Sequence, residues 1–418
     1  MINAFLLTSS WQDSTDSTEL TFWWHTPIGP VRQKVLQDSV CFIDRKHLQR
    51  AQDCAATLNW PVKIRPVALQ SFAAEQAAAC YMPSAYVYRW RDLMAEQNIV
   101  CREVDIRPTD RYLMERFIYG SAVLEGQLQQ NASGGSFSEL TDARIKAIPR
   151  VDDLPPMRVL SLDIETSFPR RGQPDRLFSV GFYAQDLQRV LMIGDSAEST
   201  PQLQFFADEL SLLQAALALI NDYDPDVIIG WNVVQFDFAF LRNKCREHSL
   251  PFNIGRDGSE LSWRQSNNNP DRIFLHIAGR VVLDGIDLLK NATWNFESFA
   301  LDYVAGELLG EGKLLHGEQR GDDIEYLFEH DKKALADYNL KDCELVLRIF
   351  AKADLLNFSV ERSNMTGLLM DRMGGSVAAF ENLYLPRLHR AGYIAPNIGE
   401  GYHEQKSPGG LVMDSRPG

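Results

Sequence analysis

Two acidic residues, Asp163 and Glu165, stand one residue apart in the stretch RVLSLDIETSF (158–168). The stretch alternates like a β-strand, with Leu160, Leu162 and Ile164 on the opposite face from the acids. Because side chains alternate across a strand, the two carboxylates lie side by side. Like charges that close raise the free energy unless a positive charge compensates them. The pair therefore predicts a bound cation.

A third acid, Asp342, falls on the apolar stripe of a helix predicted over 331–353. An acid facing the core is costly unless it is paired or binds a metal, and a buried arginine partner is the alternative. Tyr338 stands one turn before Asp342 on the same inward face, where an ordinary core role is its alternative.

A fourth acid, Asp237, lies near a predicted helix start in GWNVVQFDFAFL (230–241). It follows the short strand DVIIG (226–230), and sites in open α/β sheets gather where strands end. The alternative is that Asp237 complements the helix dipole.

These four carboxylates, without histidine or cysteine, form an oxygen-only donor set that suits Mg²⁺ or Mn²⁺. Two such ions about 4 Å apart can clamp a phosphodiester. A lone DxE on a strand is common, but the order DxE, NxxxFD, YxxxD is far more specific. We therefore predict a site with two Mg²⁺ (or Mn²⁺) ions that hydrolyses phosphodiesters.

The elements predicted around these motifs alternate between strands and helices. Three strand-like runs (157–166, 177–184 and 189–194) are separated by short loops, as in an antiparallel meander. A long helix is predicted near 202–221, with Thr200 as N-cap and Pro201 at its first position. A strand at 226–230, a helix from about 235, a strand at 280–285 and the helix at 331–353 follow. This order is typical of a ribonuclease-H-like α/β fold.

Three consecutive domains are predicted. They are a mixed α+β domain over 1–150, the ribonuclease-H-like domain over 151–355, and a helical segment with a linker over 356–418. PRVDDLPP (149–156) marks the first boundary because its prolines cannot continue a ladder.

Within the first domain, VCFIDR (40–45) and AYVYRW (85–90) alternate like strands, and SFAAEQAAAC (71–80) resembles a helix. The run YMPSAYVYRWRD (81–92) is predicted to be a half-buried strand, with base stacking on its aromatic rings as the alternative.

Composition narrows the class of protein. The chain has 418 residues, of which 45% are hydrophobic and 23% charged, as in soluble globular proteins. No apolar run approaches about 20 residues, and no basic region precedes the short apolar run at the start, so we expect no membrane partner and a cytoplasmic location. The six cysteines form no CxxC pair and are interpreted as reduced thiols. A net charge of −14 argues against a protein that coats DNA, but permits an enzyme that holds a few nucleotides.

The three motifs resemble the exonuclease motifs of the DEDD superfamily, in the branch where tyrosine stands at the position of Tyr338. Their surroundings resemble the proofreading half of a family B DNA polymerase, and their detail suggests a bacterial member. EVDIRPTDRYLMERF (103–117), FESFALDYVAGELLGEGK (296–313) and SPGG (407–410) carry this likeness, which covers essentially the whole chain.

The resemblance implies roles for the acidic residues. Asp163, Glu165 and Asp342 would hold the first metal, Asp163 would also hold the second, and Asp237 would act mainly through water. Tyr338 would orient the attacking water.

The resemblance also implies DNA contacts. Asn232 and Phe236 would help to hold a frayed 3′ end, and Gly409 and Gly410 would touch the template strand. SPGG lacks the aromatic residue often found two positions before its glycines.

The implied function is 3′→5′ proofreading on single-stranded or frayed primer 3′ ends during DNA replication and repair, by a monomer associated with the bacterial nucleoid. The family's SLYPS-like and DTD-like palm motifs are missing from the sequence, so we expect no nucleotidyl transfer. The palm, fingers and thumb of a parent chain would be partners.

One alternative is a catalytically weak nucleic-acid-binding module, which the acidity favours. The other is a stand-alone RNA exonuclease, which the long amino-terminal zone and SPGG argue against.

Overall fold

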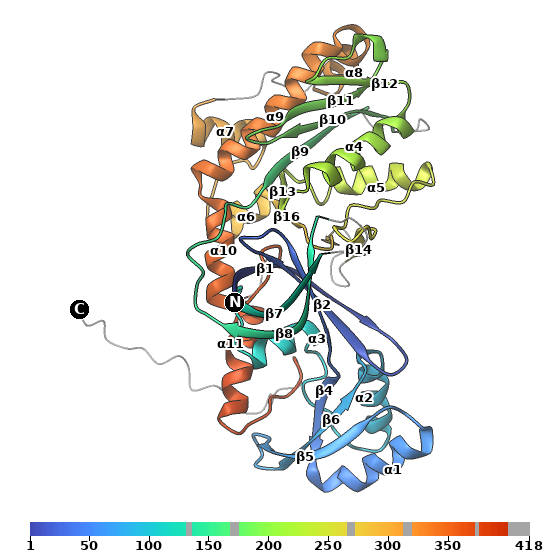
Figure 1. The fold of residues 1–418 in the computed structure, drawn as a ribbon, viewed down its shortest axis with the longest axis vertical. Coiled ribbons are helices and arrows are strands. Elements are labelled where there is room, and N and C mark those ends of the chain that lie inside the picture. Colours follow the sequence, from blue (N-terminus) through green and yellow to red (C-terminus); the bar gives the residue numbers. More distant parts are fainter. Residues whose placement is uncertain (131–135, 168–174, 266–271, 312–319, 373–375, 400–418) are drawn as a thin grey trace, which may run out of the picture. The chain divides into compact units, whose positions relative to one another are not determined.

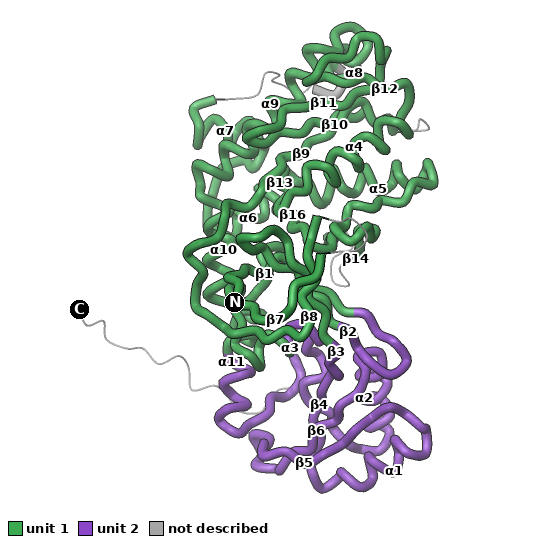
Figure 2. The backbone as a smooth tube through the Cα atoms, viewed as in Figure 1, with its two compact units in different colours: residues 1–11, 20–35, 112–383 green, residues 12–19, 36–111, 384–418 purple. Residues whose placement is uncertain are grey.

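The computed structural model describes residues 1–130, 136–167, 175–265, 272–311, 320–372 and 376–399. The chain forms two compact units (Figure 2). Unit 1 comprises 1–11, 20–35 and 112–383, and unit 2 comprises 12–19, 36–111 and 384–418. Because each unit is assembled from separate stretches of sequence, the division into three consecutive domains at 1–150, 151–355 and 356–418 stays a prediction.

A six-stranded sheet forms the centre of unit 1, in the order β12-β11-β10-β9-β13-β16 (Figure 1). Its strands are β9 (Val159–Thr166), β10 (Leu177–Tyr183), β11 (Gln188–Ile193), β12 (Leu203–Phe206), β13 (Val227–Gly230) and β16 (Val281–Asp284). Strands β9, β10 and β11 pair antiparallel, as predicted. Strands β13 and β16 extend the sheet in parallel with β9, and β12 pairs in parallel with β11.

Helices cover both faces of this sheet. Leu160, Leu162 and Ile164 pack under α4 (Glu209–Tyr223) and α5 (Asp237–Glu247). The opposite face packs against α9 (Lys332–Lys352), as Figure 1 shows, with α8 (Arg320–His330) beside it. The same side holds α6 (Gly285–Asn291), α7 (Leu301–Leu309) and α10 (Leu355–Thr366). The acidic face of β9 therefore lies under a helix.

The helix predicted near 202–221 begins later than expected. Residues Leu203–Phe206 form the edge strand β12, and α4 begins after Asp208. Asp208 accepts a hydrogen bond from the Ser211 backbone N–H at 2.8 Å, which completes a capping box. Thr200, the predicted N-cap, instead accepts from the Leu203 N–H at 3.0 Å in the turn before β12. The prediction was wrong because pairing with β11 outweighed the helical pattern of this stretch.

The amino-terminal part of unit 1 is a closed barrel in the order β1-β2-β3-β8-β7. Its strands are β1 (Ile2–Asp13), β2 (Thr18–His25), β3 (Val31–Leu36), β7 (Ser121–Gln130) and β8 (Ser138–Ala147), and α3 spans Pro108–Glu115. Phe5 and Leu7 of β1 share a core cluster with β13, β16 and α9, so the barrel and the six-stranded sheet are packed together.

Unit 2 is built on a three-stranded sheet in the order β4-β6-β5. Its elements are β4 (Ser39–Asp44), α1 (Leu48–Leu58), β5 (Lys63–Gln70), β6 (Gln76–Met82) and α2 (Val87–Glu96). The strand at 40–45 is confirmed. The helix at 71–80 and the strands at 85–90 and 81–92 are wrong, because β6 occupies 76–82 and α2 begins at Val87. The small side chains of β6 let it run between two core clusters, which overrides the helix propensity of its alanines.

Two further elements complete the description. A small sheet pairs β14 (Ser262–Gln265) with β15 (Ile273–His276), and α11 spans Ser376–Arg390. Among the residues with a described position, no helix combines the length and apolar character needed to cross a membrane.

Candidate active site

A cluster of three carboxylates lies between β9 and α9. One oxygen each of Asp163, Glu165 and Asp342 lies within 4.8 Å of the other two. Glu165 and Asp342 are buried, and Asp163 is partly exposed. The strand alternation of β9 and the helical stripe of α9 thus bring together three of the acids predicted from sequence.

The donor set of this cluster fits a divalent cation. Its ligands are carboxylate oxygens alone, which Mg²⁺ and Mn²⁺ prefer. Three negative charges this close in a largely buried site also require positive charge nearby. Within the described part of the chain, no other group of three His, Cys, Asp or Glu side chains is arranged in this way.

Asp237 lies against the same strand but outside the three-carboxylate cluster. It opens α5 and is buried, and its Oδ1 accepts a hydrogen bond from the Ile164 backbone N–H at 3.0 Å. Burial, together with the neighbouring charge of Asp163, raises the pKa of Asp237 well above its usual range. Asp237 therefore belongs to the acidic site, although its role through water stays a prediction.

The inward face of α9 presents Tyr338 and Asp342 one turn apart, as expected. Tyr338 is buried in a cluster with Phe178 and Phe328. Asn339, between Tyr338 and Asp342 in sequence, is fully buried, and its Nδ2 donates to Asp163 Oδ2 at 2.8 Å. Asn339 is not among the residues predicted from sequence, although a polar residue on an inward helical face was the available signal.

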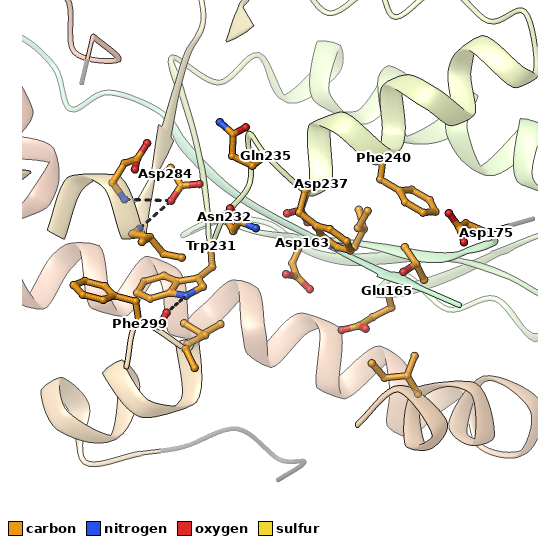
Figure 3. A pocket seen from close by; sticks show the side chains of 18 of the residues that line it. Asp163, Glu165, Asp175, Trp231, Asn232, Gln235, Asp237, Phe240, Asp284 and Phe299 are labelled. Carbon is orange, nitrogen blue, oxygen red and sulfur yellow. Dashed lines mark hydrogen bonds between the residues drawn. The ribbon is translucent and has the colours of Figure 1, made fainter. Parts of the chain in front are cut away.

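A pocket of about 860 Å³ borders the carboxylate cluster (Figure 3). Its lining includes five predicted residues, namely Asp163, Glu165, Asn232, Phe236 and Asp237. Tyr338 and Asp342 are not among the residues that line it. The pocket thus joins the acids to a space large enough for a nucleotide-sized ligand.

Four of the twenty residues that line the pocket are aromatic. Phe236 is 45% exposed and packs on Phe240 with ring centroids 6.3 Å apart. Trp231 is held by a hydrogen bond from its indole N–H to the Phe299 carbonyl at 2.8 Å, drawn in Figure 3. Asn232 adopts a left-handed backbone conformation with φ of 60°. Trp231 and Phe240 were not predicted from sequence, since aromatic residues at these spacings also occur in ordinary cores.

Asp284 is a further pocket acid that was not predicted. It ends β16 and caps α6, accepting from the Ile286 N–H at 2.9 Å. Burial and the nearby charge of Asp287 raise its pKa to about 6. The signal in the sequence was its place near the end of the strand predicted at 280–285, since sites in open α/β sheets gather where strands end.

Gly409 and Gly410, the predicted template contacts, lie outside the described residues.

Comparisons with known proteins show which family the chain resembles. Residues 99–304 match a family model described as DNA polymerase family B, exonuclease domain. DNA polymerase II of Escherichia coli (strain K12) is 42% identical over 421 residues, which cover 99% of this chain and 52% of the relative. A DNA polymerase of Archaeoglobus fulgidus is 26% identical over 338 residues, covering 80% of this chain and 39% of the relative.

Solved structures show the same fold. The family B DNA polymerase from the hyperthermophilic archaeon Pyrobaculum calidifontis superposes with a TM-score of 0.76 at 18% identity, over 96% of this chain and 52% of that chain. The chain therefore spans about half the length of these two proteins, the Pyrobaculum enzyme and the Escherichia coli enzyme.

Proposed function

We propose that the chain is a metal-dependent 3′→5′ exonuclease acting on single-stranded or frayed DNA ends, because its residues 99–304 match the exonuclease domain of family B DNA polymerases. The observation that carries this proposal is the cluster of Asp163, Glu165 and Asp342 beside an aromatic-walled pocket. A nuclease needs negative oxygen ligands next to a space that admits a nucleotide, and this arrangement supplies both.

Each residue has a proposed task in this reaction. Asp163, Glu165 and Asp342 would hold one Mg²⁺ (or Mn²⁺). Asp163 would also hold a second, with Asp237 acting on it mainly through water. When bound, such ions lower the pKa of water and stabilise negative charge on the leaving oxygen. The Tyr338 hydroxyl would orient the attacking water.

Other residues would hold the substrate. The exposed ring of Phe236 offers a face on which a base of the frayed end can stack, and Asn232, one turn earlier, also lines the pocket. Gly409 and Gly410 would contact the template strand.

The wider role follows from the relatives. We propose that the chain is the front part of a DNA-directed DNA polymerase of the DNA polymerase II kind, which proofreads during DNA replication and repair. The palm, fingers and thumb of the parent chain would present the primer 3′ end. The chain would act as a monomer at the bacterial nucleoid, and would not itself transfer nucleotides.

The test is degradation of a 5′-labelled single strand with Mg²⁺ and with EDTA. Stepwise shortening from the 3′ end that requires Mg²⁺ and disappears in Asp163→Ala and Asp342→Ala is expected. Asp337→Ala is the matched control, because Asp337 lies on the exposed side of the same helix and should keep full activity. Full activity in Asp163→Ala, or activity that survives EDTA, would contradict the proposal.

A second candidate function is nucleic-acid binding with negligible catalysis. The net charge of −14 and the acids Asp175, Asp284 and Asp287 in the pocket wall favour it over efficient catalysis, because acids that repel phosphates weaken the capture of DNA that turnover requires. The polymerase half of a parent chain would then supply most of the basic contacts with DNA. Stoichiometric binding at low salt without nucleotide release would identify this function.

A further inference from the structure

The amide of Asn339 joins the catalytic strand to the strand beside it. Its Nδ2 donates to Asp163 Oδ2 at 2.8 Å, and its Oδ1 accepts from the Ser179 hydroxyl at 3.0 Å. Asn339 and Ser179 are both fully buried. A buried amide with both ends hydrogen-bonded is held in one orientation.

The neighbouring strand β10 is shaped to receive this amide. Ser179 lies opposite Glu165 and Gly181 lies opposite Asp163 in the β9–β10 register. A Cβ atom on Gly181 would stand 2.8 Å from Asn339 Oδ1 and 2.9 Å from its Cγ. The glycine therefore leaves the space in which the Asn339 amide lies against the backbone of β10.

Chemistry determines which way the amide faces. An ionised carboxylate can only accept hydrogen bonds, so the NH₂ group must face Asp163 and the carbonyl oxygen must face the Ser179 hydroxyl. The amide restrains the carboxylate without bringing a positive charge. A lysine or arginine at this position would neutralise Asp163 and compete with a cation, whereas a neutral donor leaves its charge available.

We propose that Asn339 is a positioning residue that holds the Asp163 carboxylate in the orientation needed to bind a divalent cation. This inference rests on the proposed function, because it needs a cation at the carboxylate cluster. Groups that hydrogen-bond to metal ligands orient them, and their loss typically weakens metal binding by about 10–100-fold. Ser179 and Gly181 act through Asn339, the first by bonding its oxygen and the second by leaving room for it.

The experiment measures Mn²⁺ affinity of the full chain by electron paramagnetic resonance, which reports the free ion, beside thermal unfolding of the metal-free protein. Asn339→Leu and Gly181→Ala should each weaken Mn²⁺ binding by about 10–100-fold. Gly181→Ala keeps the asparagine but displaces its amide, so it carries the test if Asn339→Leu does not fold.

Asn382→Leu is the matched control. Asn382 is also a buried helical asparagine, and its Nδ2 donates to the Thr366 carbonyl at 3.1 Å, not to an acid of the cluster. It should lose stability but retain wild-type Mn²⁺ affinity. Equal loss of affinity in Asn382→Leu and Asn339→Leu would mean that destabilisation alone weakens binding, and would overturn the inference.

Asp163→Ala separates this inference from the proposed function. If Asp163→Ala loses Mn²⁺ binding while Asn339→Leu and Gly181→Ala bind like wild type, the positioning role is refuted and the metal site stands. If Asp163→Ala binds Mn²⁺ like wild type, the metal site itself is refuted, and the inference falls with it.

Discussion

Replacing Asp163 with asparagine should stabilise the metal-free protein while it abolishes the proposed exonuclease activity. In the absence of a cation, the carboxylates of Asp163, Glu165 and Asp342 repel one another, and Asp163 also raises the pKa of Asp237. Asparagine has nearly the same shape and can still accept a hydrogen bond from Asn339 through its own oxygen. The substitution therefore removes a repelling charge with little change in packing.

The magnitude follows from the separation of the charges. Two unit charges 4.8 Å apart repel by about 3.5 kcal/mol at an effective dielectric constant of about 20. Asp163 has two such neighbours, so full ionisation at this largest separation of the three oxygens gives a repulsion of about 7 kcal/mol. The partial exposure of Asp163 lets solvent screen much of this repulsion, so we expect a gain of about 1–3 kcal/mol in the free energy of unfolding.

A divalent cation should reverse the order of stability. A ligand that binds only the folded protein at 100 times its dissociation constant adds about 2.7 kcal/mol. Wild type gains this contribution in Mg²⁺, whereas the asparagine variant lacks one of the ligands and gains much less. The two unfolding curves are therefore expected to change places between EDTA and saturating Mg²⁺.

Urea unfolding followed by circular dichroism, in EDTA and in Mg²⁺, measures both effects. Asp337→Asn, at an exposed position of α9, is the control. The free energy of unfolding of this variant should stay within about 0.5 kcal/mol of wild type in both buffers. If the Asp163 variant is less stable than wild type in EDTA, the three carboxylates do not repel one another as argued.

Three further perturbations test other parts of the molecule. Tyr338→Phe should lower the rate of hydrolysis by about 100-fold and leave Mn²⁺ affinity unchanged, as single-turnover kinetics beside metal titration would show. Burial opposes the charge of Glu103, but Arg111 at 2.7 Å holds its pKa at about 2, below the unfolded value of 4.5. The charge therefore adds about 3 kcal/mol above pH 4.5 that is lost as the pH falls toward 2, and Glu103→Gln should remove it in urea unfolding at pH 7. Gly230→Ala would place a Cβ 2.8 Å from the Leu162 carbonyl oxygen, so it should cost about 1–3 kcal/mol in the same assay and slow hydrolysis by shifting β9; wild-type values would refute this.

Local patterns predicted much of the α/β fold. The expected likeness to the family B exonuclease domain is confirmed over residues 99–304, and the expected α/β fold by the structural likeness to a family B DNA polymerase. Strand β9 and helix α9 were predictable because their apolar residues repeat with periods of about 2 and 3.6, and such periods depend on neighbours along the chain alone.

Elements that depend on distant partners were not predictable. The sequence of Leu203–Phe206 predicts the start of a helix, but these residues pair with β11. The alanines of β6 favour a helix, but β6 pairs with β4 on one side and with β5 on the other. Local propensity is worth less than about 1 kcal/mol per residue, so tertiary pairing overrides it easily.

By itself, the sequence determined which acids could serve the site, because alternation and helical spacing placed Asp163, Glu165 and Asp342 on inward faces. Only the tertiary structure decided which groups surround them. Asn339 reaches Asp163 across 176 residues of sequence, and the space for it exists because Gly181 stands opposite that acid on the next strand. Such contacts arise from the register of two strands and the packing of a helix over them, and neither is encoded in the periodicity of any one segment.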